Sequence, residues 1–127
     1  MAKLKLTPDM LRAAYEFLCT TEPFCKWNLP DGEDVEFRVG MTVRYAGTHQ
    51  MDCGRHIISM SATKVTDTLE LIVTMAHEMI HLFMRDVDID EFEPHNTSFM
   101  KLARQVCKIH SFEYEHFLDG ARNLSRL

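Results

Sequence analysis

The amino-acid sequence predicts an α+β fold in which a small antiparallel sheet packs on an N-terminal helix, a long central helix and a following helix. Three stretches carry apolar residues at helical spacing, and the segment between the first two alternates apolar and polar residues as a strand does. The chain has 127 residues, of which 46% are hydrophobic and 26% are charged. This length and composition predict one soluble globular domain over residues 1–127.

The first helix is expected to begin at Pro8, directly after Thr7, because proline is favoured in the first turn of a helix. Its apolar face ends near Cys19 and comprises Met10, Leu11, Ala14, Tyr15, Phe17 and Leu18. Residues 20–34 contain two prolines and an Asp-Gly pair, which predict a loop. We expect Trp27 in this loop to pack against the body of the domain.

Strands are predicted over residues 35–45 and 55–61. Every odd position from 35 to 45 is apolar and most even positions are polar, which is typical of a strand with one buried face. Gly40 is expected to divide this segment into two strands or to mark a bulge. The sequence Asp52-Cys53-Gly54 predicts a turn before the second strand.

The central helix is predicted over residues 67–85, with Asp67 as its N-cap and Glu70 three residues later. Most of its circumference is apolar. The polar residues fall within a sector of about 100°, and they are Glu70, Thr74, His77, Glu78, His81 and Arg85. The sequence therefore predicts a buried helix with one polar stripe that needs partners.

The polar stripe contains the motif His77-Glu78-Met79-Ile80-His81. Histidines four apart project from the same side of a helix about one turn from each other, so both imidazoles can reach one tetrahedral zinc ion. Glu78, next to the first histidine, can then meet a water molecule on the metal. The alternative is that both histidines are helix-surface or hydrogen-bonded core residues, which leaves the polar stripe unexplained.

A zinc ion that activates water needs three protein ligands and one open position, so a third ligand must come from elsewhere. His95 is favoured, because it lies just ahead of the next predicted helix, where a tight connection can aim its ring at the metal. The alternatives are four glutamates, Glu91, Glu93, Glu113 and Glu115. We predict one Zn²⁺ ion held by His77, His81 and His95, with Glu78 as the catalytic base.

A last clear helix is predicted over residues 96–110, and the weakly patterned tail after it suggests a short docked helix. Lys101, Arg104 and Lys108 share one face of the predicted helix. We expect a solvated surface there, because a net charge of −5 gives no general attraction to nucleic acid. The remaining histidines have no spacing that ties them to the metal and are expected to be structural or surface residues. They are His49, His56, His110 and His116.

The sequence also restricts the compartment and the class of protein. No segment approaches a membrane span, and the first six residues lack the apolar stretch of a signal peptide. We therefore expect a cytoplasmic protein without membrane contact. The four cysteines are scattered and include no Cys-x-x-Cys pair, which argues against a zinc ribbon and a disulfide scaffold.

The chain resembles the SprT-like zinc metalloprotease family, which includes the Spartan proteases that degrade DNA-protein crosslinks. The resemblance covers roughly residues 40–110 and rests on residues 75–81, on His95 followed by Phe99, and on the strand 57–61. It implies a zincin-like minimal metalloprotease core without the zinc ribbon, and a third metal ligand at His95. It also implies hydrolysis of peptide bonds in protein substrates, with DNA-associated proteins among the candidates.

Three functions are open at this point. The first is a zinc endopeptidase whose substrate lies along the strand 55–61, if that strand is the free edge beside the cleft. The second is a non-catalytic module that holds a structural zinc and binds a protein or DNA partner. Glu78 argues against it, because a structural site has no use for a carboxylate beside a ligand. The third is a metallohydrolase for a small amide, which a deep closed pocket would favour.

Overall fold

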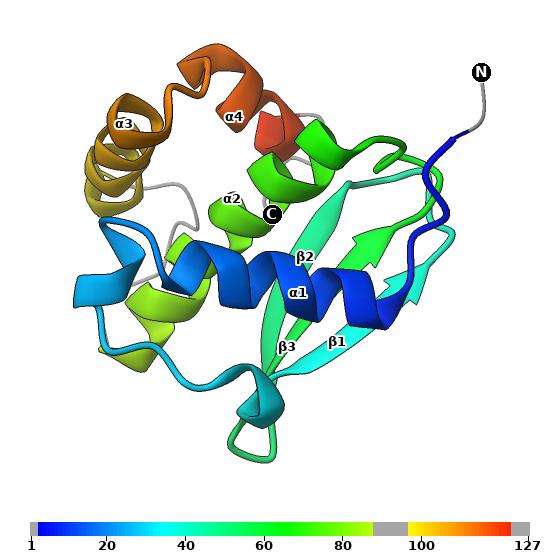
Figure 1. The fold of residues 1–127 in the computed structure, drawn as a ribbon, viewed down its shortest axis with the longest axis horizontal. Coiled ribbons are helices and arrows are strands. Elements are labelled where there is room, and N and C mark those ends of the chain that lie inside the picture. The colour runs from blue at the N-terminus through cyan, green and yellow to red at the C-terminus, as the bar shows by residue number, and fades with distance from the viewer. Residues whose placement is uncertain (1–2, 88–96, 123–127) are drawn as a thin grey trace.

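The computed structural model describes residues 3–87 and 97–122 and has the predicted α+β class (Figure 1). In chain order the elements are α1 (Pro8–Cys19), the 3₁₀ helices η1 (Phe24–Lys26) and η2 (Gly32–Asp34), β1 (Glu36–Gly40), β2 (Gly47–Asp52), β3 (Arg55–Ser61), α2 (Thr68–Asp86), α3 (Thr97–His110) and α4 (Tyr114–Arg122). The three expected helices, one before the motif, one that contains it and one after it, are confirmed, and so is a short helix in the tail.

The sheet has the strand order β1-β3-β2, and it is mixed rather than antiparallel as predicted. The chain passes from β1 to the far edge, forms β2 and returns between them as β3, so that β3 is antiparallel to β2 and parallel to β1. The turn from β2 to β3 is the predicted one. Cys53 and Gly54 both have positive φ, 50° and 79°, as a two-residue hairpin turn requires. Because β3 is the central strand, the expectation that residues 55–61 form a free edge is wrong.

The strand predicted over residues 35–45 ends at Gly40, and residues 41–46 leave the sheet. The side chains of Met41 and Val43 are 73% and 66% exposed, although their spacing continues the apolar alternation of β1. The carbonyl of Gly40 accepts a hydrogen bond from the Ala62 amide at 2.8 Å, beyond the last residue of β3. The pattern was misleading because alternation predicts one buried face but does not show whether a partner strand is present.

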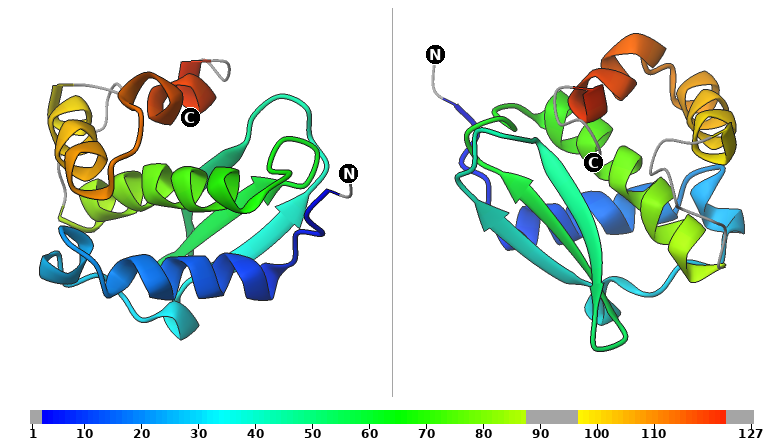
Figure 2. Two further views of the ribbon diagram at one scale, coloured as in Figure 1. Left: turned by 45° about the horizontal axis from the view of Figure 1, so that its top comes forward. Right: turned by 180° about the vertical axis from the view of Figure 1, so that it is seen from behind.

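The helices lie on one face of the sheet, as the view from behind in Figure 2 shows. α1 packs over β1, α2 packs over β2 and β3, and α3 and α4 cover the side of α2 that faces away from α1. The largest fully buried side chains come from all these layers and include Tyr15, Phe24, Ile58, Met60, Met79, Ile80, Phe99 and Phe117. α2 is therefore the central element of the core.

Local capping and packing agree with the sequence. The Asp67 carboxylate accepts a hydrogen bond from the Glu70 amide at 2.8 Å, which fixes the start of α2 where it was predicted. The hydroxyl of Thr7 does the same for α1. Trp27 of the long loop stacks on Phe83 with ring centroids 4.4 Å apart, which confirms that the loop is held against α2.

The strand β2 approaches α2 closely at Gly47. A Cβ at this position would lie 2.8 Å from Cγ2 of Thr74 and 3.3 Å from Cγ of Glu78. Both contacts are tighter than ordinary van der Waals packing, and the neighbouring atoms are buried in a packed interior. The missing side chain is thus what lets the edge strand lie directly beside the glutamate of the motif.

Gly47→Ala should destabilise the protein by about 1–3 kcal/mol, because the new methyl group forces β2 away from the helix. Urea unfolding measures the change. Gly40→Ala is the matched control, since a Cβ there meets nothing within 4 Å. Equal stability of the two variants would contradict the close contact between strand and helix.

Candidate metal centre

The motif residues lie together in the middle of α2, inside the protein. His77, Glu78 and His81 have exposed fractions of only 4%, 2% and 5%. The rings of the two histidines have centroids 5.2 Å apart and planes inclined at 62°. At the start of the stripe, the Glu70 carboxylate lies 2.8 Å from Nε2 of His116 on α4. The predicted polar stripe is therefore buried at its centre and bounded by other elements.

The ring of His77 is oriented by a backbone carbonyl of α4. Its Nδ1 lies 3.2 Å from the carbonyl oxygen of Phe117. A carbonyl only accepts hydrogen bonds, so Nδ1 carries the proton and donates it, and Nε2 keeps a lone pair. A second hydrogen bond of this kind is usual for histidines that bind metals, because it fixes the tautomer and the direction of the ring. The geometry of His77 thus fits a metal ligand.

Two phenylalanine rings pack against the imidazole rings of the motif. Phe99 of α3 stacks on His81 with ring centroids 4.6 Å apart and lies 4.9 Å from the centroid of His77. The ring of Phe117 is 5.4 Å from that of His77. Both phenylalanines are almost fully buried. These contacts restrict rotation of the imidazoles, so α3 and α4 help to fix the orientation of the two motif histidines on α2.

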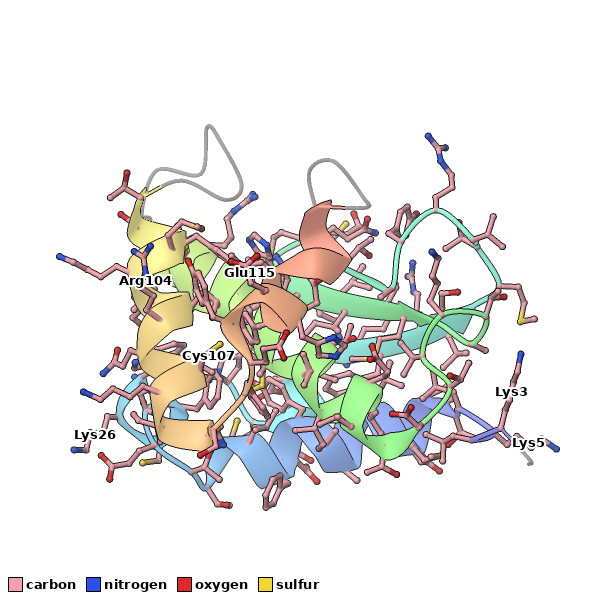
Figure 3. All side chains as sticks on the ribbon, turned by 90° about the horizontal axis from the view of Figure 1, so that it is seen from above. Lys3, Lys5, Lys26, Arg104, Cys107 and Glu115 are labelled. Atoms are coloured by element: carbon pink, nitrogen blue, oxygen red, sulfur yellow. The ribbon has the colours of Figure 1, made fainter. Side chains whose placement is uncertain are left out.

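The third predicted ligand, His95, lies outside the described residues, as do Glu91 and Glu93. Glu113 and Glu115 are described, and Figure 3 labels Glu115 on α4. Across residues 3–87 and 97–122, no three His, Cys, Asp or Glu side chains form a group that can hold a metal ion. Glu113 and Glu115 therefore do not complete a three-ligand set with His77 and His81.

A chain of hydrogen-bonded side chains connects the sheet to the end of α2. Nε2 of His49 on β2 lies 2.8 Å from Nδ1 of His56 on β3, and Nε2 of His56 lies 3.3 Å from the Asp86 carboxylate. The motif spacing gave no sign of this cluster, since its three residues come from three elements. The hairpin turn was the available signal, because two strands joined at Cys53-Gly54 bring His49 and His56 onto neighbouring positions of one face.

Burial lowers the pKa of His49 from 6.5 to about 3, and the neighbouring groups His56, His81 and Arg85 act in the same direction, because a proton on His49 would be repelled by the Arg85 guanidinium and by a proton on either of the other two rings. A neutral imidazole is therefore the stable form of His49 in the folded protein. His81 and Arg85 lie one turn apart on α2, the helix that packs over β2.

The unfolding free energy should decrease as the pH falls from 6.5 towards 3, because His49 takes up a proton in the unfolded chain but not in the folded one. Above this window both states are neutral and the contribution is constant. The maximum slope from one such group is about 1.4 kcal/mol per pH unit. Urea unfolding at several pH values should give a steeper dependence for the parent than for His49→Gln, and equal slopes would contradict the shift.

A comparison with models of protein families matches residues 14–117 to the SprT-like family, from within α1 to within α4. A search of the curated proteins found no match to the chain. None of the described helices combines the length and the apolar character needed to cross a membrane. The family match covers most of the chain, includes the buried motif and supports a metalloprotease-type function. The chain belongs to the SprT-like family.

Proposed function

We propose that this protein is a zinc-dependent endopeptidase that hydrolyses peptide bonds in protein substrates. The observation that carries the proposal is the buried stripe of His77, Glu78 and His81, in which the Phe117 carbonyl accepts from Nδ1 of His77, so that Nε2 is the ring nitrogen with the lone pair that can bind a metal. Membership of the SprT-like family supports a metalloprotease-type function, and the zinc ion and the protein substrate are the proposed refinements.

We assign the three zinc ligands to His77, His81 and His95. The first two are neighbours on α2, and their rings are packed against Phe99. His95 remains a prediction from its position in the sequence, just ahead of α3. A zinc ion held by three imidazoles supplies Lewis-acid chemistry, because it lowers the pKa of its water ligand towards neutrality and polarises a carbonyl group.

Glu78 is the proposed general base. Its side chain is buried on the same stripe as the two histidines, where it can take a proton from the attacking water. The same carboxylic acid then gives this proton to the departing amine. One residue thus serves first as the base and then as the acid, and the buried surroundings keep bulk water from competing for the proton.

The substrate is proposed to lie along β2. This strand pairs only with β3 within the described residues, so its other edge can accept an extended peptide by strand addition. Gly47 at the start of β2 lies against Glu78, which brings this edge next to the proposed base. The strand β3 cannot serve, because it is paired on both sides.

The basic residues of α3 do not extend the proposal to nucleic acid. Lys101, Arg104 and Lys108 are exposed, as predicted for a solvated face. The guanidinium of Arg104, labelled in Figure 3, lies 5.2 Å from the centroid of the Tyr114 ring, where an intramolecular cation-π contact accounts for its position. A net charge of −5 opposes general binding to DNA. We therefore propose a protein or peptide as the substrate.

Glu78→Gln should keep one equivalent of zinc and lose about 10²- to 10⁴-fold in the rate of peptide hydrolysis, because the ligands stay in place while the base is removed. Metal analysis and cleavage of unfolded casein, with and without single-stranded DNA, measure the two effects. Glu113→Gln, which changes an exposed glutamate, is the matched control. Cleavage by Glu78→Gln at the parent rate would show that another group acts as the base.

His95→Ala should lose bound zinc, and with it all hydrolysis, because two imidazoles alone hold the ion weakly. Metal analysis after dialysis against zinc-free buffer tests this. His110→Ala should retain the metal, since His110 on α3 contacts the hydroxyl of Thr21. One full equivalent of zinc in His95→Ala would contradict the ligand assignment and direct the search to Glu91 and Glu93.

A further inference from the structure

The strand β2 brings a second imidazole alongside the motif. Gly47 lies against Glu78, and His49 is two residues further along, so both face the same side of the sheet. His81 and Arg85, one and two turns beyond Glu78, both contribute to the low pKa of His49. His49 is half-buried, at the edge of the sheet where the proposed substrate would bind.

The hydrogen-bonded chain fixes the tautomer of His49. The Asp86 carboxylate only accepts, so Nε2 of His56 donates to it. In neutral His56, Nδ1 then carries a lone pair and accepts from Nε2–H of His49 at 2.8 Å. The remaining nitrogen of His49, Nδ1, is consequently a hydrogen-bond acceptor, and its direction is set by two further residues.

The acceptor Nδ1 of His49 has no hydrogen-bond donor among the described residues. The only hydrogen bond that the His49 ring makes to another described residue is the one to His56 through Nε2. The chain of side chains would hold the C-terminal end of α2 to the hairpin whether or not Nδ1 could accept. The arrangement therefore fits a donor that the described residues do not supply, and backbone N–H groups are the donors that an extended peptide brings to a sheet edge.

We infer that His49 is a substrate-binding residue of the proposed active site, and that its Nδ1 accepts a hydrogen bond from a backbone N–H of a peptide lying along β2. The inference rests on the proposed function. It assigns His56 and Asp86 as positioning residues, because they act on the substrate only through the ring of His49. The substrate class it implies is an extended polypeptide with an unsubstituted amide opposite this ring.

Two substitutions separate substrate binding from a purely structural role. The amide of Gln reaches as far from Cβ as Nε2 does, so His49→Gln keeps a donor for His56 but loses the acceptor at the Nδ1 position. The amide oxygen of Asn reaches only as far as Nδ1, so His49→Asn keeps that acceptor and loses the bond to His56. Gln50→Ala, on the opposite face of the same strand, is the matched control.

The experiment measures kcat and KM of zinc-loaded proteins on a peptide that spans a casein cleavage site mapped by mass spectrometry. His49→Gln should raise KM about 3- to 10-fold and leave kcat within about twofold, as expected for loss of one hydrogen bond made equally in the ground and transition states. The KM of His49→Asn should be closer to that of the parent, and Gln50→Ala should have the same KM and kcat as the parent. A larger defect in His49→Asn than in His49→Gln would overturn the inference, because it would show that the bond between His49 and His56 matters only for the structure.

Peptides carrying one N-methyl group each test the partner atom directly. Methylation at one backbone position should raise KM for the parent but cause no further increase for His49→Gln, because the bond is already absent. Equal methylation effects in both proteins, or an unchanged KM in His49→Gln, would overturn the inference while leaving the proposed function intact. A zinc-loaded parent that cleaves no peptide at all would overturn the proposed function and this inference with it.

Discussion

The burial of polar side chains on one helix is the constraint on which the rest of the structure depends. His77, Glu78 and His81 lie in the interior of a small domain, where each polar group must have a partner to offset its lost hydration. The carbonyl of Phe117 accepts a hydrogen bond from Nδ1 of His77, which leaves the lone pair of the ring on Nε2. The packing of α3 and α4 against α2 is thus as much a part of the centre as the motif itself.

The sheet complements this centre by bringing to it the edge strand β2, which pairs only with β3 among the described residues. The lack of a side chain at Gly47 allows β2 to lie against Glu78, and the hairpin places His49 and His56 beneath the second half of α2. Asp86 at the end of the helix closes the connection. Strand and helix are therefore held in a fixed relation by a close contact at one end and a hydrogen-bonded chain at the other, so the proposed peptide on this edge would have a defined position relative to Glu78.

Much of the fold could be predicted from the sequence, because local rules decide it: the caps at Thr7 and Asp67, the turn at Cys53-Gly54 and the helical spacing of α2. The motif of His77, Glu78 and His81 can likewise be recognised from residue spacing alone. The strand β2 was missed because its residues are mostly polar and only pairing with β3 makes them a strand. The parallel pairing of β1 and the cluster around His49 depend on which strands become neighbours, and a single sequence carries little information on such long-range choices.

The central claim is that three imidazoles bind one zinc ion and leave a position for water. X-ray absorption spectroscopy of the zinc-loaded protein tests it most directly, since the first coordination shell reports both the kind of ligand and its distance. The account predicts only nitrogen and oxygen neighbours at about 2.0–2.2 Å, with the multiple-scattering pattern of three imidazoles. A sulfur neighbour at about 2.3 Å, or a pattern that requires only two imidazoles, would contradict it.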